Sequence, residues 1–196
     1  KSARTMQFGA FPRTNIPPYF KSYAHYEKMV ENYLKIDSIS KSRQIWWKLR
    51  PHMDFGTIEF RMLDAQRSLS RTRMFVAIAQ ALVYQASEDY NNNNLNEIFS
   101  SEFLSDSLWK ATRFDFTSKI IDVNSNNVIT MKSKIRQMLN YASPALAIFG
   151  NDYIHSEIDD ILKNGPEADS QLNSFNNDGM DGLKKYLMDD VKYNIL

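Results

Sequence analysis

The sequence of 196 residues contains no cysteine, and this absence excludes several kinds of chemistry. Without cysteine the chain forms no disulfide, holds no thiolate-bound metal and has no cysteine nucleophile. The absence agrees with the reducing conditions of the cytosol, so we expect a cytoplasmic protein. The chemistry of the chain must then come from oxygen and nitrogen side chains.

An excess of charge of one sign is also lacking. The chain has 24 Lys and Arg residues against 23 Asp and Glu, a net charge of +1, which indicates no general attraction to nucleic acid or to a membrane surface. No stretch approaches the roughly 20 consecutive apolar residues of a membrane-spanning helix, and the first residues lack the pattern of a signal peptide. We predict no nucleic-acid partner and no membrane partner, so any arginine that binds a ligand must act locally.

Glycine is scarce, with six residues, and no loop has the glycine-rich pattern that binds phosphate in Walker or dinucleotide motifs. The three histidines, His25, His52 and His155, share no metal-ligand spacing, and we interpret them as structural or exposed. A bound nucleotide would therefore have to be held by a metal ion and by arginine side chains.

Residues 56–64 have the pattern of an amphipathic strand. Because successive side chains of a strand point to opposite faces, one face carries Thr57, Glu59, Arg61 and Leu63, and the other carries Ile58, Phe60 and Met62. We predict that the apolar face is buried against helices. The polar face then presents a carboxylate and a guanidinium.

A second aromatic and β-branched run at residues 45–50 predicts a neighbouring strand, and residues 51–56 predict the turn between the two. Such a hairpin brings Arg50, Glu59 and Arg61 within reach of one another. One interpretation is a site for a divalent cation and phosphate, since carboxylate oxygen binds Mg²⁺ and the donors of arginine match phosphate. The alternative is a solvated strand face with ion pairs that stabilise little.

The run WWKLRPHMDFGTIEFRMLDAQRSLSR, residues 46–71, resembles the glutamate-cysteine ligase and carboxylate-amine ligase family. In that family an aromatic-rich strand ending in Arg-Pro precedes Gly-Thr-Ile/Val-Glu-Ile/Val-Arg and an Asp. More distantly, Glu59-Phe60-Arg61 followed by Asp64 is similar to the Glu-x-Arg-x-x-Asp strand of glutamine synthetases. The resemblance implies an α+β fold in which part of a glutamine-synthetase-like, antiparallel curved sheet precedes a helix-rich C-terminal portion.

The resemblance also implies roles for individual residues. Glu59 would be a ligand of Mg²⁺ or Mn²⁺, and Arg61 and Arg50 would be catalytic residues at the transferred phosphoryl group. Arg4 lies in a Ser-x-Arg pattern that the family places at the edge of the site, so it would bind a phosphate or a substrate carboxylate. Arg113 ends a Trp-x-Ala-x-Arg pattern and would bind substrate, or it would stack on Trp109 one helical turn earlier.

The domain organisation follows from the same resemblance. We expect residues 1–196 to be the C-terminal part of one catalytic domain, with strands, a loop and one helix in residues 1–64 and mainly helices in residues 65–196. The missing N-terminal half of that domain, which carries an early Glu-x-Glu strand in the family, is then an expected partner. A second copy of the chain in a homo-oligomer is another.

The most regular apolar spacing predicts a long helix after residues 65–70. Its inward face would carry Phe75, Ile78, Ala79, Leu82, Val83 and Ala86, at i, i+3, i+4, i+7, i+8 and i+11. Arg67, Arg71 and Arg73 crowd its first turns, and we expect them to extend into solvent.

Further helices are predicted over residues 22–36, 130–141 and 154–164. Ser143-Pro144 is expected to start or kink another helix, which Gly150 ends. Residues 176–182 are polar, and we expect them to be mobile and to precede a short last helix. Ser170 stands where the family often has Arg, so no ligand contact is assigned to the tail.

The function implied by the resemblance is ATP-dependent ligation of a carboxylate to an amine, through an acyl phosphate that the amine attacks. Glutamate and cysteine, or another amino acid or small carboxylate and amine, would be the substrates, with ATP and Mg²⁺ or Mn²⁺ as cofactors. Two alternatives remain open. The chain could be a catalytically silent scaffold or regulatory partner, or a metal-independent anion-binding module built on its arginines.

Overall fold

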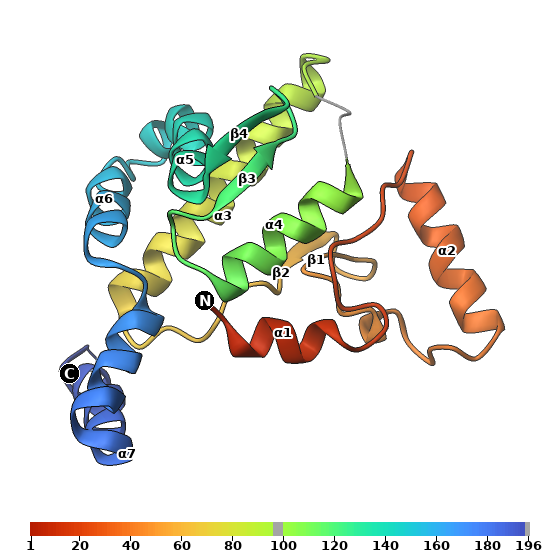
Figure 1. Ribbon diagram of the computed structural model, residues 1–196. Helices are drawn as coiled ribbons and strands as arrows, with labels where there is room; N and C mark the ends of the chain where they lie inside the picture. Colours follow the sequence, from red (N-terminus) through yellow and green to blue (C-terminus); the bar gives the residue numbers. More distant parts are fainter. Residues whose placement is uncertain (96–99, 195–196) are drawn as a thin grey trace. The chain divides into compact units, whose positions relative to one another are not determined.

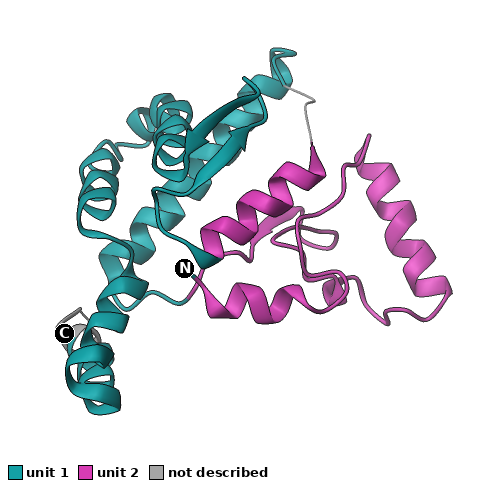
Figure 2. Ribbon diagram, viewed as in Figure 1, with its two compact units in different colours: residues 1, 65–98, 113–196 teal, residues 2–64, 99–112 magenta. Residues whose placement is uncertain are grey.

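The computed structural model describes residues 1–95 and 100–194, which form helices and two small antiparallel sheets, an α+β composition (Figure 1). The chain divides into two compact units (Figure 2). One unit holds residues 2–64 and 99–112, and the other holds residue 1, residues 65–98 and residues 113–196. Each helix in the described part of the chain is too short or too polar to cross a membrane.

The unit of residues 2–64 and 99–112 contains one hairpin and several helices. Its elements are α1 (Ala3–Gly9), α2 (Tyr23–Lys35), the 3-10 turn η1 (Ser42–Gln44), β1 (Leu49–His52), β2 (Thr57–Phe60) and most of α4 (Ser101–Arg113). Its buried apolar core joins α2 to the approach of β1 and consists of Tyr26, Val30, Ile39, Ile45 and Trp47. The predicted helix of residues 22–36 is thus confirmed as α2, with the Ser22 side chain accepting a hydrogen bond from the backbone N–H of His25.

The predicted hairpin is present, but its strands are shorter and shifted. β2 ends at Phe60, whereas the sequence predicted a strand over residues 56–64, and β1 includes Pro51 and His52, which were predicted as turn. The backbone N–H of Arg61 donates to the carbonyl of Lys48, so the alternation of an antiparallel ladder makes Pro51 a non-hydrogen-bonded position toward β2. A proline, which has no N–H, can therefore occupy β1 without breaking the ladder.

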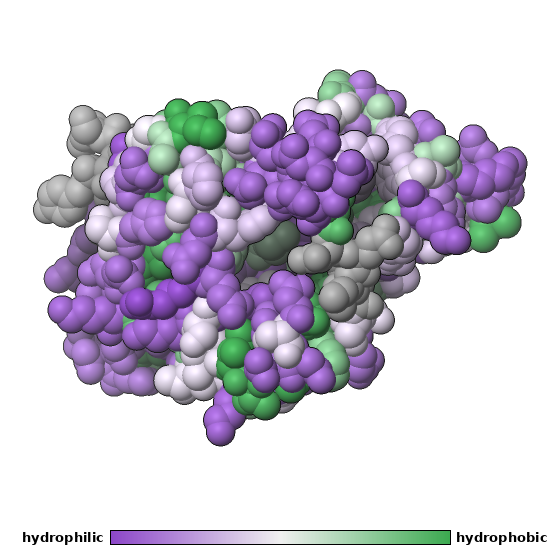
Figure 3. Space-filling model, turned by 90° about the horizontal axis from the view of Figure 1, so that it is seen from above, coloured by the Kyte–Doolittle hydropathy of each residue, from purple (hydrophilic) through white to green (hydrophobic). Residues whose placement is uncertain are grey.

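The prediction that the apolar face of the hairpin is buried is wrong. Ile58 is 47% exposed, Met62 is 39% exposed, and Phe60 is half-buried. Trp47, on the approach to β1, occupies the core beside α2, and among the described residues this core does not extend over Ile58 and Met62. Figure 3 shows that hydrophilic residues cover most of one face of the molecule, with separate apolar patches between them.

The second unit is built on three packed helices. Its elements are α3 (Leu69–Asn91), β3 (Lys119–Asp122), β4 (Asn127–Thr130), α5 (Met131–Ile148), α6 (Ile154–Asn164) and α7 (Glu167–Asn194). Its core consists of residues from α3, α5 and α6, namely Met74, Ala77, Ile78, Ala81, Leu139, Ala142, Ala145, Leu146, Ile154, Ile158 and Leu162. The four alanines let α3 and α5 approach closely.

The inward face of α3 matches the predicted one only in part. Ile78 is buried, and Phe75 and Leu82 are partly buried against the core, as predicted. Val83 and Ala86 are exposed, and the other buried residues of α3 are Met74, Ala77 and Ala81. Apolar residues cover so much of the circumference of α3 that spacing alone does not identify the stripe that packs on α5.

The region between α4 and α6 contains a hairpin that the sequence analysis did not describe. β3 pairs with β4 in antiparallel fashion, and residues 123–126 connect them. α5 begins after Thr130, whose hydroxyl accepts a hydrogen bond from the N–H of Ser133. It continues through Pro144 to Ile148, so no new helix starts at Ser143.

The C-terminal helices correct two further predictions. α6 ends at Asn164, as predicted, and the following Gly165 has a φ of 95°. Residues 176–182 belong to α7 and are interrupted only at Asp178 and Gly179. Arg67 does not extend into solvent: its Nε lies 2.5 Å from Oε1 of Glu167, and its guanidinium lies 3.7 Å from the ring centroid of Tyr186.

Candidate active site

The pairing of β1 with β2 brings the predicted charged residues together. Arg50 lies directly opposite Glu59 in the ladder, and Arg61 follows Glu59 by two residues, which places it on the same face. The sequence prediction that Arg50, Glu59 and Arg61 come within reach of one another is therefore confirmed. The roles assigned to them remain predictions.

Glu59 is the centre of the arrangement, because each of its carboxylate oxygens accepts from a different arginine. Arg50 Nη2 donates to Oε2, and Arg61 Nη1 donates to Oε1 over 2.5 Å. The side chain of Glu59 is 38% exposed and that of Arg61 is 28% exposed. A dissolved ligand can therefore reach this pair.

Arg50 has a different environment from Arg61. Its side chain is only 8% exposed, and its Nη1 donates to the carbonyl oxygens of Arg43 and Ile45 at 2.7 and 2.9 Å. These bonds and the bond to Glu59 engage both Nη atoms of a guanidinium that would be costly to bury unpaired, while its buried Nε has no hydrogen-bond partner among the described residues. Arg50 thus fixes the orientation of the Glu59 carboxylate from the buried side, and Arg61 is the more accessible of the two cations.

Arg4 approaches the segment that follows β2. It lies on α1, which begins after Ser2, whose hydroxyl accepts from the N–H of Thr5. The Arg4 guanidinium donates to the carbonyls of Arg61 and Leu63, each at 3.2 Å, and lies 3.4 Å from Oδ1 of Asp64. Its role as a substrate contact stays a prediction, but its place beside Arg61 fits that role.

Lys48 is a member of this group that the sequence analysis missed. It precedes β1, its N–H donates to the carbonyl of Asn15 at 3.0 Å, and its carbonyl accepts from Arg61 at 2.8 Å. The residue is 6% exposed. Burial lowers the pKa of the Lys48 ammonium, and the positive charges of Arg4 and Arg61 lower it further. The negative charge of Asp64 partly offsets these effects. The sequence signal that could have identified Lys48 is its spacing of two residues from Arg50, since that spacing places both side chains on one face of an extended strand.

The charged residues around Glu59 include more cations than carboxylates. Four cationic side chains, Arg4, Lys48, Arg50 and Arg61, accompany two carboxylates, Glu59 and Asp64. Guanidinium and ammonium donors directed at one face suit an anion with several oxygens, such as phosphate or carboxylate. The arrangement can therefore hold an oxyanion.

A metal role for Glu59 meets a less favourable geometry. Both Glu59 oxygens are engaged by arginine, and the described residues contain no group of three or more His, Cys, Asp or Glu side chains placed to hold a metal ion. Mg²⁺ binds through carboxylates together with water and phosphate oxygens. The described residues of this chain thus do not by themselves fit a complete site of this kind.

Arg113 is not brought to Glu59 within one compact unit. It ends α4 and belongs to the unit of residues 113–196, whereas Glu59 belongs to the other. The aromatic ring described beside its guanidinium is that of Phe114, 5.8 Å away. Its predicted role in substrate binding therefore stays a prediction.

Residues 1–187 match the model of the family described as glutamate-cysteine ligase family 2. Three similar proteins are each named "Putative glutamate--cysteine ligase 2".

The protein of Solibacter usitatus is 29% identical over 198 residues, covering 100% of this chain and 51% of its own length. That of Herpetosiphon aurantiacus is 28% identical over 179 residues, covering 91% and 46%. That of Sorangium cellulosum is 30% identical over 172 residues, covering 88% and 46%.

The chain spans about half the length of the curated relatives it matches. The family match, in contrast, extends over nearly the whole chain and includes the hairpin of Arg50, Glu59 and Arg61. On this evidence the chain belongs to glutamate-cysteine ligase family 2.

Proposed function

We propose that this protein takes part in ATP-dependent ligation of a carboxylate to an amine, of the glutamate-cysteine ligase type, through an acyl phosphate. The observation that carries the proposal is the Glu59 carboxylate held between Arg50 and Arg61 on one hairpin face, in a chain of this family. Glutamate and cysteine are the proposed substrates because the relatives carry that name.

The reaction has two transfers. An oxygen of the substrate carboxylate attacks the γ-phosphorus of ATP, and ADP leaves. The amine nitrogen then attacks the acyl carbon, phosphate leaves, and the nitrogen loses a proton to give the amide. Negative charge on the phosphoryl oxygens must be stabilised in the first transfer and again as phosphate leaves, so positioning and charge neutralisation are the protein's main tasks.

We assign positioning and charge neutralisation to individual arginines. Arg61 is the accessible cation that donates to the transferred phosphoryl group. Arg50, buried beneath Glu59, fixes the geometry of the pair. Arg4 and Arg113 are proposed to bind the substrate carboxylate or a phosphate of ATP.

A divalent cation, Mg²⁺ or Mn²⁺, is part of the proposal, with Glu59 as one ligand. When bound, such an ion would neutralise phosphate charge. Since the described residues do not form a complete metal site, the remaining ligands would come from ATP, water or residues outside this chain. No step above passes through the ion.

The proposed fold context is a glutamine-synthetase-like curved sheet in which β1 and β2 are two neighbouring strands. The exposed Ile58 and Met62 support a larger sheet or a cover on that side. The half of the relatives' length that this chain does not match is the proposed source, and a second copy in a homo-oligomer is the alternative.

The test is ligation by the protein extended to the full length of its relatives. The extended protein is expected to release ADP and phosphate only when glutamate, cysteine and a divalent cation are all present. ATP binding without turnover under those conditions would favour a silent scaffold. Phosphate binding that needs no metal, with no ATP turnover, would favour an anion-binding module, an alternative that the excess of cations also supports.

A further inference from the structure

Lys48 is a buried cation that forms no ion pair among the described residues. No carboxylate of the described residues lies within 4.0 Å of its ammonium. The charges that act on it come from Arg4 and Arg61, which repel it, and from Asp64, which attracts it. Burying a charge costs free energy unless a counter-charge accompanies it, so the folded chain leaves this position short of negative charge.

The carboxylates around Lys48 are engaged elsewhere. Both oxygens of Glu59 accept from Arg50 and Arg61, and Oδ1 of Asp64 lies 3.4 Å from the Arg4 guanidinium. Lys48, Arg4 and Arg61 therefore carry more positive charge than the neighbouring carboxylates neutralise.

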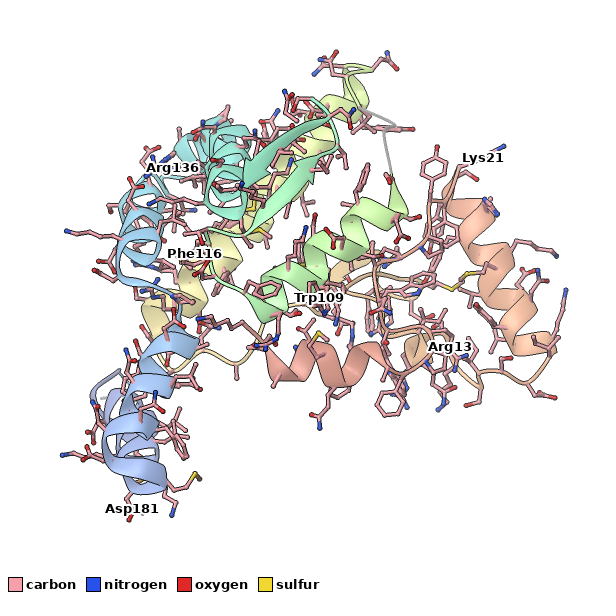
Figure 4. The ribbon with its side chains drawn as sticks, viewed as in Figure 1. Arg13, Lys21, Trp109, Phe116, Arg136 and Asp181 are labelled. Carbon is pink, nitrogen blue, oxygen red and sulfur yellow. The ribbon has the colours of Figure 1, made fainter. Side chains whose placement is uncertain are left out.

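The backbone fixes Lys48 more firmly than a surface lysine. Its N–H is bonded to Asn15 on one side and its carbonyl to Arg61 on the other. Arg13, labelled in Figure 4, accepts from the N–H of Trp46 in the same way, and the intervening Thr14 is buried. Residues 46–48 are thus bonded to residues 13–15 on one side, and Lys48 is bonded to Arg61 on the other. Alternation sets the Lys48 side chain on the face that carries Arg50.

We propose that Lys48, Arg61 and Arg4 form an oxyanion subsite on the hairpin face, in which Lys48 is the buried donor to a phosphate. The subsite itself follows from the charges of these residues. Its assignment to the transferred phosphoryl group, as opposed to another phosphate or a carboxylate, rests on the proposed function.

The experiment measures binding of inorganic phosphate to the chain by calorimetric titration at low ionic strength and neutral pH. Lys48→Met is expected to weaken phosphate binding at least about tenfold, and Lys48→Arg, which keeps a cation there, is expected to weaken it less. Lys35→Met is the matched control, because Lys35 is an exposed lysine at the end of α2 in the same unit. Far-UV circular dichroism checks that each variant is folded.

A second measurement needs no variant. In the wild-type chain with ¹³C-labelled lysine, one lysine is expected to titrate below the ordinary pKa of 10.5, and saturating phosphate is expected to raise that pKa. Phosphate that leaves every lysine pKa unchanged would overturn the subsite, whether or not Lys48→Met folds.

The experiments distinguish a failure of the oxyanion subsite from a failure of the proposed ligase reaction. Equal phosphate affinity in the wild type, Lys48→Met and Lys35→Met, or equal weakening in both variants, would mean an adventitious ion only and would overturn the subsite. Ligation by the extended wild-type protein would then still support the proposed function. Phosphate binding that depends on Lys48, in a protein without ligase activity, would retain the subsite and remove the proposed reaction.

Discussion

The two compact units each contain one hairpin, and the two hairpins share one backbone design. β1 pairs with β2, and β3 with β4, over four residues on each side. The last residue of each connection, Gly56 or Asn126, has a φ of 59° or 56°. Its N–H donates to the carbonyl of the last residue of the first strand, His52 or Asp122.

Their charges differ in arrangement. In the β3–β4 hairpin the buried Asp122 accepts from the N–H and hydroxyl of Ser125 and from Lys134 Nζ at 2.6 Å. Its carboxylate holds the turn and pairs with one cation. In the β1–β2 hairpin the buried charges are the cations Lys48 and Arg50.

The comparison distinguishes a charged residue that stabilises the fold from charged residues that are placed to bind a ligand. Asp122 has all its partners within its own hairpin and the helix that follows. The face of Arg50, Glu59 and Arg61 keeps more cations than carboxylates, an arrangement that costs stability unless an anion completes it. The following predictions test this distinction, from the largest expected effect to the smallest.

Arg50→Met should destabilise the unit that contains it by about 3–5 kcal/mol, because it removes the donor to the carbonyls of Arg43 and Ile45 and to Oε2 of Glu59. All three tryptophans, Trp46, Trp47 and Trp109, lie in that unit, so tryptophan fluorescence during urea unfolding measures it. Lys28→Met, which removes an exposed ion pair with Glu31 in the same unit, is the control and should cost less than about 1 kcal/mol. Equal losses would contradict the structural role of Arg50.

Glu59→Gln should lower ligation by the extended enzyme about 10²- to 10³-fold, equivalent to about 2.7–4 kcal/mol of transition-state stabilisation. The change keeps the size of the side chain and removes the charge between the two arginines. The rate of ADP release at saturating metal is the measurement. Asp122→Asn should leave that rate nearly unchanged, and normal turnover in Glu59→Gln would exclude the proposed site.

Asp122→Asn should instead cost about 1.5–3 kcal/mol of stability, the range for hydrogen bonds to a charged group. Hydrogen bonds from Lys134 and Ser125 lower the pKa of Asp122 below its ordinary 3.8. The stabilisation is therefore present above pH 3.8 and is lost as the pH falls below it through the folded-state pKa. Urea unfolding followed by circular dichroism from pH 7 to pH 3 should show a smaller pH dependence in the variant.

Gly56→Ala should destabilise the β1–β2 hairpin by about 1–2 kcal/mol, the cost of a left-handed conformation for a residue with a Cβ. No atom lies within 4 Å of a Cβ built there, so the backbone alone sets the cost. Asn126→Gly at the equivalent position should change stability by only a few tenths of a kcal/mol. Thermal unfolding of both variants measures the difference, and a neutral Gly56→Ala would show that the two turns are not equivalent.

The meeting of Arg50, Glu59 and Arg61 could be predicted because it depends on alternation and on one turn, both of which are local. The positions of α2, α5 and α6 could be predicted for a similar reason, since apolar spacing and a cap or a glycine mark them.

The buried faces could not be predicted as well. Whether Ile58 and Met62 are covered depends on which segments pack above them, and the stripe of α3 that is buried depends on α5. Lys48 was missed because a lysine in a strand is usually exposed, and its backbone partner Asn15 lies more than thirty positions earlier in the chain.

The double pairing of Lys48 has a consequence for how this part of the chain can change in evolution. A one-residue insertion or deletion between Lys48 and Arg50 would send these two side chains to opposite faces, since the alternation has a period of two. An insertion within residues 53–56 would lengthen an exposed connection and leave the alternation on both strands intact. Length differences among homologues should therefore collect in this connection, while the spacing from Lys48 to Arg50 and from Glu59 to Arg61 stays fixed wherever the oxyanion subsite is used.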